Sequence, residues 1–486
     1  MADRFYAGFS TVSLKPAITL DKNFVDEVNV NSMALGNGTD TCVIVVIDIV
    51  SMRAHLTFPL RAEIAKTLDM GEDQICIYTT HNHGSRTSEM DMEKFNRACV
   101  ASAGEAVGSL KEVEVARIAV HPSVPINIRR RIHFKDYGAF SFWYGHRDLG
   151  NGTADGSHLI KLELNNLFQG NLSYVRCLPL PEEPGEDDFN VPDAPVPVEE
   201  PLLFPEATDD LVQGLFFREP DGTPAGSCIR FSAHAVTANR TDTDWRSGDY
   251  PVYMMRKLRE KFGGNALYLP GPAGNQCPVT ERKSLSLAKK FGEQLADIAL
   301  EPLGNAEWEQ EGPFGFCSPN VCLPPRKEIF MTQEEIDKEI SQIKNKIKDL
   351  AGNKDALAEL KVLNERHELL KHRGSSHPEH WKGISDEELK TTGYCHPLFA
   401  VRMGTTVMAG LPGEPFAEYS VRLRQETGLG DRLIVTELAN GHISYFPTKE
   451  EYAAGSYEPV SCSYIPESED LIISAAEKGI SELESV

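Results

Sequence analysis

The sequence predicts an α/β fold in which a mixed sheet core is flanked by helices and carries an inserted antiparallel helical hairpin. Short apolar, β-branched runs alternate with longer segments whose apolar residues recur at helical spacing. This alternation is typical of a sheet with helices packed on it. Near residue 340 it gives way to two consecutive amphipathic segments, which indicates a helical hairpin added to the core.

The first part of the chain shows the alternation most clearly. We predict strands at 41–50, 74–79 and 112–121 and helices at 56–68 and 90–110. Right-handed crossovers would place the strand C-termini at one edge of the sheet, the usual location of an active site in an open α/β fold. His81 and His83 lie just past the end of one of these strands, which favours a functional role for them.

The segment 178–210 interrupts the pattern. It contains eight prolines, eleven acidic residues and no basic ones, and proline suits neither a helix interior nor a central strand. We therefore predict an extended surface loop. After it, the predicted elements are strands at 227–233, 266–269, 399–409 and 432–438 and helices at 252–261, 284–300, 415–425 and 467–482.

The hairpin is predicted at 331–373, inserted into one large catalytic domain that spans 1–486. Its first stripe consists of Ile336, Ile340, Ile343, Ile347 and Leu350, and its second begins with Leu357, Leu360 and Leu363. Gly352-Asn353 breaks the helical pattern between them. Packing against the body of the protein is the simplest interpretation. The alternatives are a lid and a subunit contact in a homo-oligomer.

Composition excludes several functional classes. The chain has 49 basic and 72 acidic residues and a formal net charge of −23, so we expect no nucleic-acid partner. No apolar run is long enough to span a bilayer. The first residues lack the basic cluster and apolar stretch of a signal peptide. Because the ten cysteines form no CxxC pair, we expect reduced thiols in a cytoplasmic protein.

Four segments far apart in the chain carry residues that suit a hydrolytic metal site. They are Thr80-His81-Asn82-His83, the single His234, Pro412-Gly413-Glu414, and Asn440 through Tyr445. Catalytic zinc binds a few nitrogen and oxygen ligands and keeps one position for water. Two histidines, a carboxylate and a phenol would meet that requirement, and manganese or iron would also accept such a mixed site.

Each of these residues also has a structural interpretation. His81 and His83, two positions apart at a strand end, can point the same way, but pairs of exposed loop histidines are common. His234 ends an apolar strand, where a histidine is more often a satisfied core residue. Glu414 at a helix start serves as a cap, and Tyr445 suits an amphipathic strand.

A Gly/Pro-rich loop follows the predicted strand 266–269. Such loops expose backbone N–H groups that can hold an oxyanion or a phosphate. The loop is not a Walker motif, since no Gly-Lys-Ser/Thr follows. Cys277 within it is a candidate nucleophile, and the alternative is a passive thiol in a tight turn.

Taken together, these segments resemble the neutral (alkaline, non-lysosomal) ceramidase family of zinc amidases. The matching motifs are Ala7-Gly8-Phe9-Ser10 with Lys15-Pro16, Thr80-His81-Asn82-His83, Ser232-Ala233-His234-Ala235, Gly274-Asn275-Gln276-Cys277-Pro278, Pro412-Gly413-Glu414, and the block from Asn440 to Tyr457 with Glu450-Glu451-Tyr452 inside it. They occur in the family's order over nearly the whole chain. From the length, we expect the family's C-terminal immunoglobulin-like domain to be absent.

The resemblance implies a role for individual residues. It implies zinc on His81, His234, Glu414 and Tyr445, a proton-transferring histidine at His83 and a substrate-polarising tyrosine at Tyr457. It also implies an arginine from the run Arg129-Arg130-Arg131, with Arg129 or Arg130 preferred and Arg130 our choice. We therefore predict a hydrolase that cleaves an amide bond with zinc-activated water.

Three departures from the family separate this chain from a typical ceramidase. Gly84-Ser85-Arg86 stands where the family has Ser-Gly-Pro, and Asn275 and Cys277 replace an aspartate and a serine. We also expect no export signal, and the predicted hairpin is a further departure. We therefore expect a small soluble amide substrate rather than ceramide, with Arg86 or the arginine run as candidates to hold a substrate carboxylate.

The same metal site admits other functions. An ester or lactone hydrolase or a phosphoesterase would use the same activated water. A non-catalytic, metal-stabilised binding protein would hold zinc without an open coordination position. A cysteine hydrolase would depend on Cys277.

Overall fold

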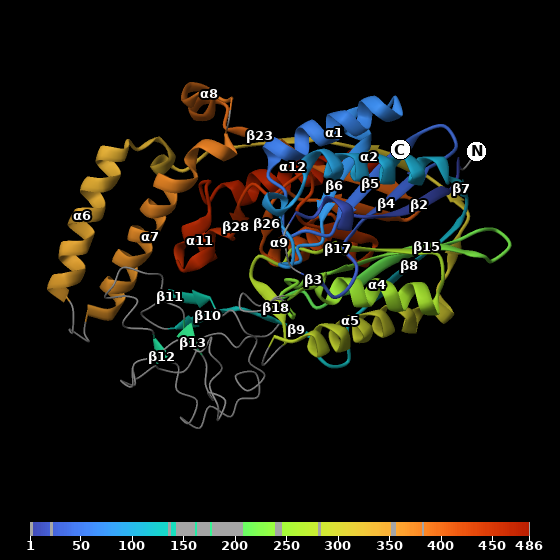
Figure 1. The fold of residues 1–486 in the computed structure, drawn as a ribbon, viewed down its shortest axis with the longest axis horizontal. Coiled ribbons are helices and arrows are strands. Elements are labelled where there is room, and N and C mark those ends of the chain that lie inside the picture. The colour runs from blue at the N-terminus through green and yellow to red at the C-terminus, as the bar shows by residue number, and fades with distance from the viewer. Residues whose placement is uncertain are drawn as a thin grey trace.

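The computed structural model describes residues 3–19, 23–134, 138–141, 161–162, 175–176, 208–238, 245–279, 283–350, 356–381 and 383–485. The predicted loop 178–210 lies outside the described residues, apart from its last three. Within the described ranges the fold is mixed α/β, with helices packed on sheets and a pair of long helices at one end (Figure 1). The predicted fold class is confirmed.

Three mixed sheets form the core, and each contains one parallel pair. The first has the order β6 (Ile75–Thr79), β5 (Thr41–Ile47), β4 (Asn29–Gly36), β2 (Tyr6–Ser13), β7 (Lys111–Glu112). The second has the order β17 (Asn265–Pro270), β15 (Pro224–Phe231), β14 (Val212–Arg218), β8 (Glu114–Val120), β19 (Trp308–Glu309). The third has the order β21 (Phe314–Cys317), β24 (Phe399–Met403), β25 (Thr406–Gly410), β27 (Leu433–Thr436). The parallel pairs are β5–β6, β15–β17 and β25–β27.

The three sheets share one apolar core. Ile44 of β5, Leu267 of β17 and Met408 of β25 belong to the same cluster of buried side chains. The run from Cys42 to Ile47 is buried at every position because its sheet is covered on both faces, which explains why that strand is continuously apolar. Packing among the sheets therefore fixes the strand ends relative to one another.

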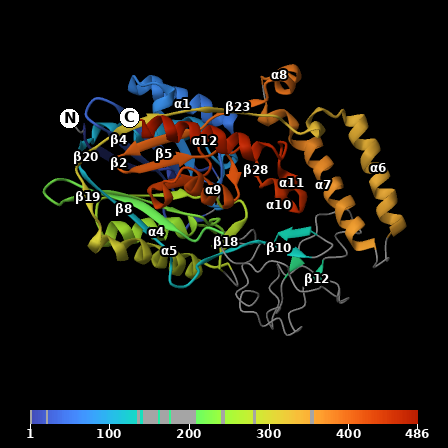
Figure 2. The ribbon, with the colours of Figure 1, turned by 180° about the vertical axis from the view of Figure 1, so that it is seen from behind.

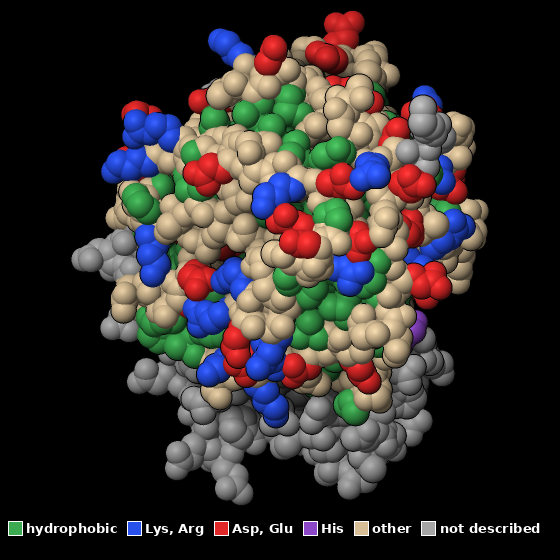
Figure 3. Space-filling model, turned by 90° about the vertical axis from the view of Figure 1, so that its right-hand side faces the viewer, with side chains coloured by type: hydrophobic (Ala, Val, Ile, Leu, Met, Phe, Trp, Pro, Cys, Tyr) green, Lys and Arg blue, Asp and Glu red, His purple; other side chains and the backbone are tan. Residues whose placement is uncertain are grey.

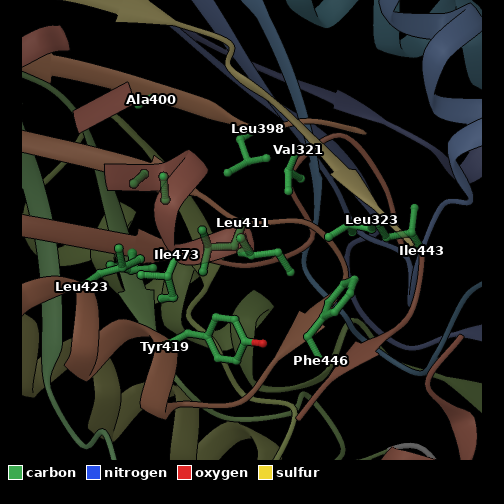
Figure 4. Packing of buried hydrophobic residues seen from close by; sticks show 14 of the residues in the cluster. Val321, Leu323, Leu398, Ala400, Leu411, Tyr419, Leu423, Ile443, Phe446 and Ile473 are labelled. Atoms are coloured by element: carbon green, nitrogen blue, oxygen red, sulfur yellow. The ribbon is translucent and has the colours of Figure 1, made fainter. Parts of the chain in front are cut away.

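Two helices pack against each sheet. They are α1 (Ala54–Leu68) and α2 (Met92–Gly108) on the first, α4 (Asp249–Lys261) and α5 (Leu285–Leu300) on the second, and α9 (Glu418–Glu426) and α12 (Ser468–Glu484) on the third. Figure 4 shows the last of these interfaces, where Leu411, Tyr419 of α9 and Ile473 of α12 lie in one cluster. Apolar burial of this kind is the main stabilising contribution to the fold.

The remaining described strands form two-stranded pairs. They are β1 (Asp3–Arg4) with β20 (Glu311–Gly312), β3 (Asn23–Phe24) with β16 (Trp245–Arg246), β9 (Asn127–Arg129) with β18 (Gln276–Pro278), β10 (Arg131–Phe134) with β11 (Gly138–Ser141), β12 (Lys161–Leu162) with β13 (Val175–Arg176), β22 (Asn320–Leu323) with β23 (Tyr394–Pro397), and β26 (Glu414–Pro415) with β28 (Tyr445–Phe446). The short helices are α8 (Asp386–Thr391), α10 (Lys449–Ala453) and α11 (Tyr457–Ser461).

The helical pair consists of α6 (Gln333–Leu350) and α7 (Leu357–His380). The two helices lie side by side at one end of the molecule (Figures 1 and 2). Their contact buries Ile336, Ile343 and Leu360, and Val460 of α11 joins the same cluster. The hairpin therefore packs against the segment that follows the predicted metal-binding block.

Two expectations need correction. The predicted strand 399–409 is two strands, β24 and β25, which turn at Gly404 with φ +60°. Cys322 and Cys395 face each other on β22 and β23 and form a disulfide, so reduced thiols were the wrong expectation for this pair. The other described cysteines take part in no disulfide.

The surface shown in Figure 3 carries acidic and basic side chains interspersed with small groups of apolar ones, as on an ordinary protein surface. Among the described residues, no helix combines the length and the apolar character that a bilayer crossing requires.

Candidate metal centre

The parallel strand pairs bring the predicted ligands together. His81, His234 and Glu414 each lie a few residues beyond the end of a parallel-paired strand, namely β6, β15 and β25 respectively. A parallel bridge joins Asn82 to Ala235. His81 and His234, which directly precede these two residues, therefore lie next to each other. The carboxyl ends of these strands therefore form a single site, as the open α/β rule predicts.

Glu414 lies between the two histidines. Its Oε2 is 3.3 Å from His81 Nε2 and 3.1 Å from His234 Nε2. The three ligand atoms lie within 4.8 Å of one another, and all three side chains are buried. One carboxylate oxygen facing two imidazole nitrogens is an arrangement that suits a divalent cation.

Backbone carbonyls fix the orientation of both imidazoles. His81 Nδ1 lies 2.7 Å from Val50 O, and His234 Nδ1 lies 3.0 Å from Gln276 O. Each Nδ1 must carry the proton to donate to its carbonyl, so each Nε2 presents a lone pair to the centre. His81 adopts φ +59°, a left-handed conformation uncommon for residues other than glycine.

In these contacts, hydrogen-bond acceptors face one another without a proton between them. Both Nε2 lone pairs face Glu414 Oε2, and burial lowers the pKa of His234 to about 4, so no proton bridges that pair at neutral pH. The buried His81 Nε2 has no hydrogen-bond partner among the described residues, since its 3.3 Å approach to Glu414 lacks hydrogen-bond geometry. A cation between these atoms would satisfy all of them, so the residues fit a metal ion.

The chain around Glu414 is tightly packed. Gly413 has φ +57°, and a Cβ there would lie 2.2 Å from Ser444 O. Only glycine fits such a close approach at this backbone conformation. Beyond it, β26 and β28 pair in parallel and set Glu414 directly opposite Tyr445, which places the phenol beside the carboxylate.

Of the three consecutive arginines, the middle one enters the site. Arg130 Nη1 lies 3.3 Å from His234 Nε2. Arg129 and Arg131 both pair with Glu451, at 2.9 and 2.8 Å. Arg130 lies in the bend between β9 and β10, and of the three it is the one whose guanidinium lies beside a predicted metal ligand.

Glu458, which the sequence analysis did not identify, anchors this arginine. It is fully buried, and its two oxygens lie 2.9 Å from Arg130 Nε and 2.6 Å from Arg131 Nη1. Burial alone would raise the pKa of Glu458, but the two guanidiniums hold it below its usual value. The only sequence signal that could have indicated such a residue was the arginine run itself, since buried cations need nearby carboxylates.

The remaining predicted residues surround the same centre. The ring of His83 is 5.1 Å from that of His81, and its buried Nε2 has no hydrogen-bond partner in the described part of the chain. The Tyr445 ring lies 5.7 Å from the Arg130 guanidinium and 5.6 Å from the Tyr457 ring. Thus all seven residues predicted for the site lie together.

The pKa shifts of these groups have clear causes. Burial, followed by His81, lowers the pKa of His83 well below its usual value, so this imidazole is neutral at pH 7. Burial and the charge of Glu414 raise the pKa of Tyr445. Without a cation, the phenol therefore keeps its proton.

His442 is a second residue that sequence reasoning missed. Its Nε2 lies 2.9 Å from Glu414 Oε1, the oxygen that faces away from the other two histidines, and its side chain is 21% exposed. The signal was its position, three residues before Tyr445 in a segment already identified.

The sequence analysis also named three other residues. Cys277 is buried, and burial raises the pKa of its thiol to about 12, so it is no thiolate at neutral pH. Asn275 binds Glu418 Oε2 at 2.7 Å and Ala417 N at 3.0 Å, which is a structural role at the start of α9. Arg86 is exposed.

Comparison with known proteins identifies the fold. No family model and no curated protein matches the chain. A solved structure described as a ceramidase complexed with C2 matches 99% of this chain and 76% of its own, with 15% identity and a TM-score of 0.62. Neutral ceramidase from Pseudomonas aeruginosa matches 100% of this chain and 75% of its own, again with 15% identity and a TM-score of 0.62.

The chain has the neutral ceramidase fold. This similarity in fold extends over the full chain. Within the neutral ceramidase fold, the buried group formed by His81, His234 and Glu414 is a candidate metal site.

Proposed function

We propose that the protein is a zinc-dependent hydrolase that cleaves an amide bond in a small soluble substrate. The observation that carries the proposal is the position of Glu414 Oε2 between two imidazole nitrogens whose orientation is fixed by backbone carbonyls. Zinc held by these three residues and Tyr445 would supply a water nucleophile at neutral pH. The ceramidase fold supports the same class of chemistry.

The neighbouring residues have distinct tasks in this proposal. The neutral His83, whose Nε2 has no hydrogen-bond partner in the described structure, accepts a proton from the nucleophile and passes it to the leaving amine. The Tyr457 hydroxyl donates a hydrogen bond to the developing oxyanion. Arg130, held by Glu458, adds a fixed positive charge beside them.

Amide cleavage is our choice among the reactions this site could support. An ester or lactone hydrolase would use the same residues, so matched amide, ester and lactone substrates must be compared. A non-catalytic protein would bind zinc and turn over none of them. The high pKa of Cys277 argues against a cysteine hydrolase.

The test uses the full chain loaded with zinc and a panel of N-acyl amides with their matched esters and lactones. We expect amide hydrolysis that disappears on chelation and returns with zinc. His83→Ala should lower kcat by about 10²–10⁴-fold, and His81→Ala should abolish both zinc binding and turnover. The control is His121→Ala, an exposed histidine that pairs with Asp210. Amide hydrolysis that survives rigorous chelation would overturn the proposal.

A further inference from the structure

A strained residue precedes the proposed catalytic tyrosine. Ser456 has φ +80° and ψ −166°, a backbone region that is essentially restricted to glycine and is strained for other residues. Such a conformation persists only where the surroundings enforce it. Tyr457 and Glu458 follow directly, in the first turn of α11, so whatever holds Ser456 also fixes their position.

The helical hairpin holds this turn from one side. Glu365 of α7 accepts a hydrogen bond from the Ser456 backbone N–H at 2.6 Å. Lys361, one turn earlier, donates to Glu365 at 2.6 Å and to Ala454 O at 3.4 Å. The side chains of Glu365 and Lys361 are 15% and 6% exposed. These contacts are therefore largely shielded from water, where hydrogen bonds to charged groups are strongest.

The backbone of the turn is adapted to this contact. Gly455 has φ +76°, and a Cβ there would lie 2.4 Å from Glu365 Oε2. Glycine thus allows the carboxylate to approach the chain closely. Any side chain larger than that of glycine at position 455 would therefore collide with Glu365 of the hairpin.

The strand pair β10–β11 holds the turn from the other side. Ser456 Oγ lies 3.0 Å from both the backbone N and the Oγ of Ser141. Arg131 Nη2 donates to Gly455 O at 2.8 Å. The turn is therefore enclosed between the arginine strand of the metal centre and helix α7.

We propose that the hairpin is a positioning element of the metal centre: Glu365 enforces the strained turn at Ser456 and thereby places Tyr457 and Glu458. Apolar packing supports this link, because Tyr457 and Val460 contact the hairpin's own cluster. Glu365 touches no reacting atom. It acts through the turn, and its removal frees the first turn of α11.

The test compares Glu365→Ala, Glu365→Gln and the wild type by amide hydrogen exchange over residues 454–461. Glu365→Ala should raise exchange at least about tenfold, because it removes a hydrogen bond to a charged group. Glu365→Gln keeps an oxygen acceptor and should restore exchange to within about threefold of wild type. Glu359→Ala, an exposed glutamate on the same helix, is the control and should leave exchange unchanged.

Two further readouts separate positioning from general damage. Zinc affinity in Glu365→Ala should stay within about threefold of wild type, because none of the metal ligands touches the hairpin contact. The kcat should fall about tenfold or more while KM changes little, since misplacement of a catalytic group affects the chemical step. If Glu365→Ala does not fold, Lys361→Met replaces it and should also raise exchange.

The outcomes are distinct. Unchanged exchange in the Ala variant would overturn the proposal, as would increased exchange with unchanged kcat. The kcat readout rests on the proposed function, whereas the exchange readout does not. If the wild type hydrolyses no amide, the proposed function fails and exchange alone decides whether the hairpin holds the turn.

Discussion

Replacing His442 with alanine should weaken zinc binding without removing a ligand. In the structure, His442 Nε2 lies 2.9 Å from Glu414 Oε1, while Oε2 faces the two ligand imidazoles. This contact fixes which oxygen faces the metal position. Loss of such a partner of a metal ligand typically costs 10–100-fold in affinity. We therefore expect the zinc Kd to rise about 10–100-fold, or by about 1.4–2.8 kcal/mol.

The assay is competition for zinc with a chromophoric chelator at neutral pH. His442→Gln offers an amide N–H to the same carboxylate oxygen and should recover most of the affinity. His121→Ala removes a histidine from an exposed pair with Asp210 and should change nothing. An unchanged Kd in His442→Ala would refute the reasoning. Loss of a nitrogen ligand in X-ray absorption would also refute it, because His442 would then bind the metal directly.

Three other changes test separate parts of the structure. Glu458→Gln deprives two buried guanidiniums of their shared carboxylate, so urea unfolding should show a loss of about 3–5 kcal/mol; a loss below about 1 kcal/mol would contradict this pairing. Burial lowers the pKa of His396 to about 4, so the unfolded chain binds an extra proton below pH 6.5 and wild-type stability falls on acidification. In His396→Gln, the loss of unfolding free energy between about pH 7 and pH 5, measured by urea unfolding, should be smaller by about 2 kcal/mol. An equal loss in the variant and the wild type would count against this explanation. Tyr457→Phe should lower kcat about 10²-fold with zinc affinity retained, and an undiminished kcat would exclude the proposed role.

The sequence predicted elements well where one physical signal dominated. The apolar run that forms β5 is buried on both faces, and its composition alone indicates a strand. Strand β4 gave no such signal: Asn31 and Ser32 are as buried as their apolar neighbours, so neither alternation nor a continuous apolar run marks it. The turn between β24 and β25 was missed because only Gly404 and Thr405 separate the two strands, and Gly404 is the single turn signal there.

The arginine run shows how far local rules reach. The sequence places three arginines in a row, but nothing in the run itself indicates which of them faces the metal ligands. That choice depends on Glu451 and Glu458, which lie more than 300 positions away in the sequence. Contacts over such separations come from the arrangement of the sheets, which no sequence window contains.

The groups that orient the metal ligands are even harder to predict from the sequence than the contacts of the arginine run. The two ligand histidines are held by the carbonyls of Val50 and Gln276, and every residue type offers a carbonyl. No side-chain pattern can therefore mark these positions, although they decide which ring nitrogen faces the cation. Sequence could indicate the donors His81, His234 and Glu414 because metal chemistry restricts their residue types. The backbone that orients them follows from the parallel strand pairs, so only the fold explains why these donors face one another.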